Sequence, residues 1–154
     1  MARAPFQVLV FPFRRSSNNT YEYALFRRSD AGYWQGIAGG GEDEESPLLA
    51  AQREACEEAG IPSNAPFYRL QTTAYVPVTS LGDRKAWPSD LLVIPEHCFA
   101  VETAVPIRLS PEHLEMMWLP YEECREHLHW HSNKTALWEL DERLKTGRLP
   151  APCR

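Results

Sequence analysis

Residues 39–60, GGGEDEESPLLAAQREACEEAG, contain seven carboxylates and a single basic residue, Arg53. On a helix that turns about 100° per residue, Glu54, Glu57 and Glu58 fall within an arc of roughly 100°. Glu57 and Glu58 would lie in the last helical turn, where the helix dipole disfavours anions. Glu54 and Glu58 also repel each other at their i, i+4 spacing. A bound divalent cation would relieve this repulsion, whereas the alternative is a solvated acidic face, which is the usual role of a charge run.

The donor types indicate which cation would bind. Carboxylate and carbonyl oxygens, without cysteine or imidazole, favour Mg²⁺ or Mn²⁺ over zinc. The three glycines Gly39–Gly41 precede the helix, and glycine allows either φ > 0 or a close approach of the backbone, so a carbonyl could reach the same place. Because Mg²⁺ is usually shared with substrate phosphates, the pattern predicts a phosphorylated small-molecule substrate.

Capping residues predict where this acidic helix begins and ends. Ser46 suits the N-cap, and Pro47 is tolerated at the first helical position, where its missing N–H costs nothing. Gly60 is expected to end the helix and so to support the site structurally. Leu48, Ala55 and Ala59, with Cys56 beside them, fall on the side away from the carboxylates and are expected to pack on a sheet.

The rest of the chain predicts the scaffold for this helix. The order of the expected elements is not a regular βαβ alternation, so we expect an α+β fold with a mixed sheet flanked by helices. In the last helix, Thr135, Ala136, Leu140 and Leu144 form an apolar stripe. Strands are expected at 6–13, 21–28, 33–41, 67–79, 97–104 and 114–120, and helices at 47–59, 121–128 and 132–145.

Composition limits the class of protein. The length of 154 residues suits a single domain spanning 1–154. A net charge of −5 disfavours stable binding to nucleic acid or acidic membranes. The apolar runs are too short to span a bilayer and no signal peptide is evident, so we expect a cytoplasmic protein. The four cysteines are widely spaced, which indicates reduced thiols.

The acidic segment resembles the Nudix box, G-x5-E-x7-R-E-U-x-E-E-x-G-U, in which U is apolar. Its positions are occupied here by Gly39, Glu45, Arg53, Glu54, Ala55, Glu57, Glu58, Gly60 and Ile61. The flanking segments LFRRSDAGYWQGIAGGGE, LSPEHLEMMWLPYEEC and WHSNKTALWEL are similar to the dihydroneopterin triphosphate and dATP pyrophosphohydrolase branch of this family.

The resemblance implies an α/β/α sandwich and an Mg²⁺-dependent pyrophosphohydrolase, with Mn²⁺ as a possible substitute. Water would attack a diphosphate linkage in a nucleoside or pterin triphosphate. Glu54, Glu57 and Glu58 would bind metal, and the Gly39 carbonyl would add an oxygen. Arg53 would orient a glutamate by charge-assisted hydrogen bonds, with Glu45 as its partner.

Several roles stay open at this point. The general base would be Glu54 or Glu112, with Glu115 as the competitor if the register of the loop differs. ADP-ribose or another nucleoside diphosphate derivative is the alternative substrate, and a non-catalytic nucleotide-binding module is the alternative class of protein. The chain would be a monomer or a homodimer. Weak candidates for substrate contacts are Arg27, Trp34, Lys85 and Lys134.

Overall fold

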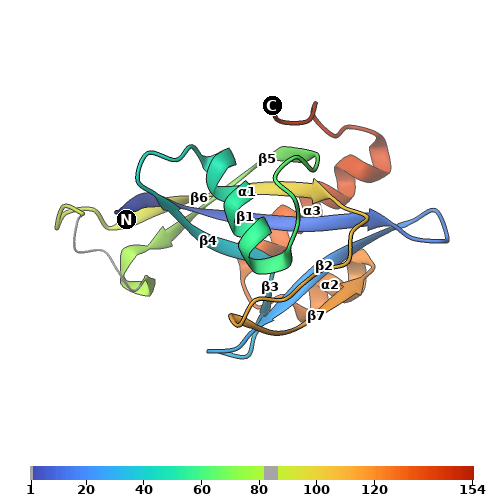
Figure 1. Cartoon of the computed structure of the whole chain (residues 1–154), viewed down its shortest axis with the longest axis horizontal. Helices are drawn as coiled ribbons and strands as arrows, with labels where there is room; N and C mark the ends of the chain where they lie inside the picture. Colours follow the sequence, from blue (N-terminus) through green and yellow to red (C-terminus); the bar gives the residue numbers. More distant parts are fainter. Residues whose placement is uncertain (1, 82–86) are drawn as a thin grey trace.

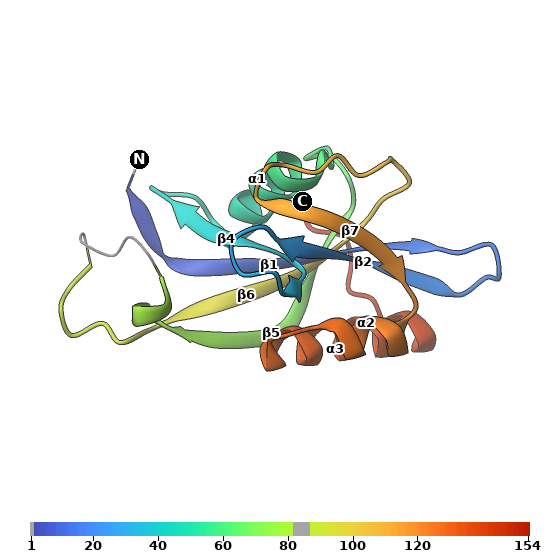
Figure 2. The same cartoon turned by 90° about the horizontal axis from the view of Figure 1, so that it is seen from below.

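The strands form one mixed sheet between two helical layers. The computed structural model describes residues 2–81 and 87–154. In Figure 2, α1 lies on one side of the sheet, and α2 and α3 lie on the other, which confirms the predicted α/β/α sandwich. The elements in chain order (Figure 1) are β1 (Arg3–Arg15), β2 (Tyr21–Arg28), β3 (Trp34–Gln35), β4 (Ile37–Glu42), α1 (Pro47–Ala59), β5 (Phe67–Pro77), a 3-10 turn η1 (Val78–Ser80), β6 (Val93–Glu102), β7 (His113–Leu119), α2 (Tyr121–His127) and α3 (His131–Thr146).

The long strand β1 organises the sheet. It pairs with β6 in parallel over residues 7–13, and with β4 and β2 in antiparallel fashion on its other side. Pro12 lies between Val10, the last residue that pairs with β4, and Phe13, the first that pairs with β2. Proline has no N–H to donate to a neighbouring strand. β1 tolerates Pro12 because this residue lies where the partner strand changes from β4 to β2.

Each face of the sheet carries its own apolar core. The core on the α1 face contains Val8, Phe26 and Phe99, and Leu9, Phe11 and Leu137 belong to the core under α2 and α3. The two cores use alternating residues of the same strands, as the two-residue period of a strand requires. The sheet is therefore covered on both faces.

The limits of α1 agree with those predicted from its caps. The Ser46 side chain accepts a hydrogen bond from the Leu49 N–H at 3.2 Å. Gly60 adopts the left-handed conformation with φ 70°, and its N–H donates to the Cys56 carbonyl at 3.0 Å. The helix is thus closed at both ends by the backbone chemistry that the sequence indicated.

The buried face of α1 is rotated relative to the prediction. Four alanines of α1 are fully buried, namely Ala50, Ala51, Ala55 and Ala59. Glu58 is almost completely buried as well. Cys56, which was expected beside the packed residues, is exposed. Because the packed alanines carry only a methyl group, the helix approaches the sheet closely. The expectation that Glu58 faces away from the sheet was therefore wrong.

The strand expected at 33–41 is divided in two. The break falls at Gly36, whose N–H donates to the Asn133 side chain at 3.0 Å. Gly39–Gly41 lie within β4 and not in a loop before the helix, and Val8 pairs with Gly39. None of these three glycines has a positive φ. Glycine allows either a positive φ or a close approach of the backbone, and close approach is the property that applies at these three positions.

The C-terminal helix differs from prediction at one position. Ala136, Leu137 and Leu140 are buried on the sheet, whereas Thr135 is exposed. None of the helices in the described part of the chain has the length and apolar character that crossing a membrane requires. All four cysteines are free thiols, as expected.

A buried carboxylate on α3 stabilises an irregularity in β5, where the pairing with β6 shifts between Arg69 and Thr73. Glu139 accepts hydrogen bonds from the backbone N–H groups of Gln71 and Thr72, each at 2.7 Å. We expect Glu139→Ala to lower the free energy of unfolding by about 1–3 kcal/mol, because it leaves these donors unpaired. Urea unfolding measures this loss.

Glu142→Ala on the same helix is the matched control, since the Glu142 carboxylate makes no hydrogen bond in the described part of the chain. Equal stabilities of the two variants would show that Glu139 does not hold the β5 irregularity.

Candidate active site

Arg53 is the central cation of the acidic segment. Its Nε donates to Glu45 Oε2 at 2.8 Å and its Nη2 to Glu45 Oε1 at 2.9 Å, so the pair forms a two-pronged fork. Nη2 also donates to the Gly40 carbonyl at 2.8 Å, and Nη1 donates to Glu54 Oε1 at 2.9 Å. One guanidinium therefore ties together the strand β4, the loop after it and the helix α1.

Gly39 is required by the position of Glu54. A Cβ atom added at Gly39 would collide with the Glu54 carboxyl group. The side chain of Glu54 is only 12% exposed, because it lies against the β4 backbone. The absence of a side chain at Gly39 thus leaves the space into which Glu54 folds.

Glu58 is a buried residue near the end of α1. It is 3% exposed, and its Oε2 has no hydrogen-bond partner in the described structure. Its Oε1 lies 3.7 Å from Nε2 of His113. Burial raises the pKa of Glu58 far above the usual range of a carboxyl group, and hydrogen bonding with Glu112 and the charge of Glu54 raise it further.

The loop before β7 brings Glu112 to this place. The Arg108 N–H donates to the Ala59 carbonyl at 2.9 Å and the Ser110 N–H to the Glu58 carbonyl at 3.4 Å. On the other side, the Ser29 N–H donates to the Glu112 carbonyl at 2.9 Å. The free carbonyls at the end of α1 are thereby satisfied, and the loop is held between the helix and the turn after β2.

Glu54, Glu58 and Glu112 therefore form one carboxylate cluster. Burial raises the pKa of Glu54 as well, against the lowering effect of its hydrogen bonds with Glu58 and Arg53. An unpaired buried oxygen and mutually repelling carboxylates destabilise the site. A cation with oxygen ligands would offset both effects, so the residues present fit Mg²⁺ or Mn²⁺.

Glu57 stands apart from this cluster. Its side chain is 59% exposed and is directed to Arg53, with Oε2 at 3.4 Å from Nη1. In the described residues, no group of three His, Cys, Asp or Glu side chains is already arranged as a metal site. Rotation of the exposed Glu57 side chain is the change that would bring a third box glutamate toward Glu54 and Glu58.

The other predicted contacts lie in different places. The Arg27 side chain donates to the Glu115 carboxylate at 2.8 Å and to the Gly32 carbonyl at 3.2 Å. Arg27 and Glu115 are therefore bonded to each other. Trp34 packs against the core under α2 and α3, and Lys134 lies on α3 itself. Trp34 and Lys134 thus belong to the face opposite α1. Lys85 falls outside the described residues.

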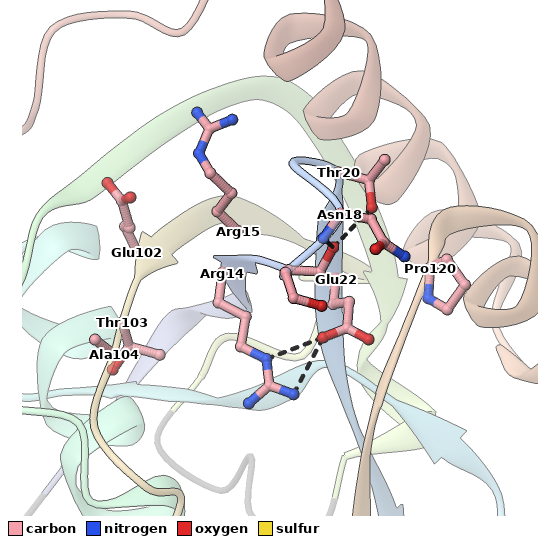
Figure 3. A pocket seen from close by; sticks show the side chains of 11 residues that line it. Arg14, Arg15, Asn18, Thr20, Glu22, Glu102, Thr103, Ala104 and Pro120 are labelled. Carbon is pink, nitrogen blue, oxygen red and sulfur yellow. Dashed lines mark hydrogen bonds and ion pairs between the residues drawn. The ribbon is translucent and has the colours of Figure 1, made fainter.

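A broad hollow of about 1010 Å³ lies away from the carboxylates, near the turn between β1 and β2 (Figure 3). Arg14 and Glu22 in its wall bond to each other at 3.1 Å. The hollow does not include Glu54, Glu58 or Glu112. We therefore base the candidate active site on the carboxylate cluster and not on the size of a cavity.

Two contributors to the site were not predicted from the sequence. His113 follows Glu112 directly and contacts Glu58, and Ser29 anchors the Glu112 backbone. Side chains alternate between the two faces of a sheet along a strand. A strand that begins at His113 would therefore have placed its imidazole on one face of the sheet. Nothing in the sequence around Ser29 indicates its contact with residue 112, because that contact arises from the pairing of β2 with β7.

Comparisons with known proteins agree with this fold. The NUDIX domain family model matches residues 6–138. A crystal structure assigned as a NUDIX hydrolase from Listeria monocytogenes is 42% identical, with a TM-score of 0.86, and covers 96% of this chain and 99% of that chain. No curated protein matches the chain.

Two further structures share the fold at lower identity. The Escherichia coli dihydroneopterin triphosphate pyrophosphohydrolase is 21% identical, with a TM-score of 0.75, and covers 93% of this chain and 99% of that chain. A Caenorhabditis elegans Ap4A hydrolase is 17% identical, with a TM-score of 0.69 and the same two coverages of 93% and 99%.

These matches define the class of protein, which is a Nudix hydrolase. The family model spans most of the sequence, and the Listeria protein matches nearly all of it. The chain belongs to the Nudix family, as its acidic segment indicated.

The fork between Arg53 and Glu45 makes a prediction about stability. Lysine at position 53 keeps the charge but cannot form two parallel bonds. We expect Arg53→Lys to lower the free energy of unfolding by about 1–3 kcal/mol at pH 7. Arg53 holds the pKa of Glu45 below its usual range, chiefly through hydrogen bonding. This contribution is therefore present above the unfolded pKa of about 4.3 and is lost as the pH falls through the lower folded pKa.

Urea unfolding of both proteins between neutral and strongly acidic pH measures the difference. Arg14→Lys is the control, because its pair with Glu22 is partly exposed, at 43% and 26%, and exposed pairs contribute little. A difference that does not shrink in acid would contradict the prediction.

Proposed function

We propose that this chain is a divalent-metal-dependent Nudix pyrophosphohydrolase, active as a single domain over residues 1–154. Its substrate would be a nucleoside or pterin triphosphate, from which it releases pyrophosphate. The observation that carries the proposal is the buried Glu58 carboxyl group next to Glu54 and Glu112, whose Oε2 has no hydrogen-bond partner among the described residues. A carboxylate cluster of this kind serves a hydrolase of phosphoric anhydrides when a cation links it to substrate phosphates.

The proposed metal ligands are Glu54, Glu57 and Glu58, with the Gly39 carbonyl as a further oxygen. Mg²⁺ or Mn²⁺ bound there would lower the pKa of a water and neutralise charge on the phosphate oxygens. The contribution of the chain is to hold these oxygens in a small space. Arg53 fixes Glu54 through the bond at 2.9 Å, and the backbone at Gly39 supports the same side chain from behind.

Glu112 is the proposed general base. It is exposed, so that a water molecule can reach it, and it lies beside Glu58. Its backbone is fixed by Ser29, whose Oγ and N–H each donate to the Glu112 carbonyl at 2.9 Å. Glu54 is less suited to accept a proton from water, since it is largely buried and already accepts a hydrogen bond from Arg53. Acceptance of the proton by Glu112 would leave the attacking oxygen free to bond to phosphorus.

The proposed substrate class rests on the flanking sequence, with support from the fold. The segment SPEHLE and the tryptophan after it are similar to the dihydroneopterin triphosphate branch, and the E. coli enzyme of that name has the same fold. A triphosphate is compatible with the formal net charge of −5, because a bound cation would supply positive charge at the phosphates.

A substrate panel tests the proposed activity. Purified protein with Mg²⁺ is given dNTPs, dihydroneopterin triphosphate, ADP-ribose and dinucleoside polyphosphates, and the release of pyrophosphate or phosphate products is measured. We expect turnover of a triphosphate, and at least about a hundredfold loss in Glu58→Gln, which removes a metal ligand and keeps the shape of the side chain. No turnover of any compound would overturn the enzymatic proposal, and preference for ADP-ribose would overturn the substrate class.

A matched pair of variants tests the general base. Glu112→Gln removes the proton acceptor beside Glu58, so we expect kcat to fall by about 10²–10⁴-fold with little change in KM. Glu115→Gln changes a glutamate of the same strand region that is bonded to Arg27, and should leave kcat within a few-fold of wild type. The opposite order of effects would assign the role of base to Glu115.

A further inference from the structure

A buried histidine beside Glu58 has no role yet in the proposed reaction. His113 is the first residue of β7, and its side chain is 1% exposed. Its Nε2 lies 3.7 Å from Glu58 Oε1, and it is the one basic side chain paired with Glu58 in the described parts of the chain. The imidazole ring packs on Phe26, with ring centroids 5.3 Å apart.

Packing alone does not account for an imidazole at this position. Nδ1 of His113 is buried without a hydrogen-bond partner among the described residues, as is Oε2 of Glu58. An apolar ring would fill the same space against Phe26 without burying an unpaired nitrogen, which destabilises a fold. Of the two ring nitrogens, Nε2 is the one that faces Glu58, so its contact with this carboxyl group is the feature of His113 that packing on Phe26 does not explain.

The backbone fixes His113 more firmly than it fixes the Glu58 side chain. The His113 N–H donates to the Ser110 carbonyl at 3.2 Å, and Ser110 is itself bonded to the end of α1. Two methylene groups connect the Glu58 carboxyl group to the backbone of α1, and they allow this group to turn. A shift of about 0.5–1 Å would bring Oε1 within hydrogen-bond distance of Nε2.

We propose that His113 is a positioning residue, whose Nε2–H orients the Glu58 carboxylate toward the bound cation. The inference rests on the proposed function. Carboxylates that bind metals are commonly held by a second hydrogen-bonding group, and the loss of such a group weakens metal binding about 10–100-fold. His113 is suited to this role because its ring is buried, fixed by the backbone and directed at a ligand oxygen.

Titration with Mn²⁺, followed by electron paramagnetic resonance of the free ion, tests the proposal without substrate. We expect His113→Phe to weaken Mn²⁺ binding about 10–100-fold, since it keeps the ring on Phe26 and removes the donor. His113→Gln places an amide N–H near the position of Nε2, and should restore binding to within a few-fold of wild type. At Mn²⁺ concentrations below saturation, kcat should rank wild type and the His113 variants in the same order as their affinity for Mn²⁺.

Met116→Ala is the control for packing. Met116 is the strand partner of Phe26 and packs on the same core, and it has no hydrogen bond to a carboxylate in the described residues. Circular dichroism establishes that each variant is folded at the temperature of the titration. If His113→Phe does not fold, His113→Asn takes its place, because its shorter side chain leaves Glu58 without the donor.

The outcomes separate the two proposals. Failure of the wild-type protein to bind Mn²⁺ would overturn the proposed function, and the role of His113 with it. Normal binding by wild type and by His113→Phe, or by wild type and His113→Asn, would overturn the positioning role alone. Equal weakening in Met116→Ala and in the His113 variants would also overturn it, since packing would then explain the loss.

Discussion

The burial of negative charge beside one guanidinium is the constraint on which the site depends. Arg53 neutralises part of the acidic segment by bonding to Glu45 and Glu54, and it also bonds to the Gly40 carbonyl. Glu58 receives no such bond and is instead enclosed between the helix and the sheet. The protein therefore balances the charge of Glu45 internally, whereas no guanidinium is bonded to Glu58 in the described residues.

This division follows from the way α1 packs. Small residues at Ala51, Ala55 and Ala59 allow the helix to lie close to the sheet, which buries Glu58. The same closeness requires Gly39 in β4, because a side chain there would occupy the position of the Glu54 carboxyl group. Side-chain size on two neighbouring elements thus sets how far the carboxylates are removed from water, and burial is what shifts their pKa values.

The sequence predicted those features that depend on local chemistry. The caps at Ser46 and Gly60 fixed the limits of α1, and the order of strands and helices indicated the layered fold. The resemblance to the Nudix box also implied that Arg53 would pair with Glu45, and these two side chains are bonded in the structure. The burial of Glu58 was not anticipated, since a helical wheel places side chains around an axis but does not fix which arc the sheet covers.

Contacts between distant segments were beyond prediction for the same reason. The meeting of His113 with Glu58, and of Ser29 with the Glu112 carbonyl, depends on the register between β2 and β7. A shift of one residue in that register would turn the side chain of residue 113 to the other face of the sheet. Residue types alone do not specify such a register, whereas the paired strands do.

The attachment of the loop before β7 to the end of α1 also divides the site into two parts. Arg53, Glu45 and Glu54 belong to contiguous chain between β4 and α1, whereas Glu112 reaches the cluster through a loop held by few backbone hydrogen bonds. Segments held in this way open at lower free energy than the core of a sheet. Local opening of that loop would move Glu112 away from α1 while the hydrogen bonds of Arg53 stay formed. Amide hydrogen exchange would then report the loop and the β4–α1 segment as separate units.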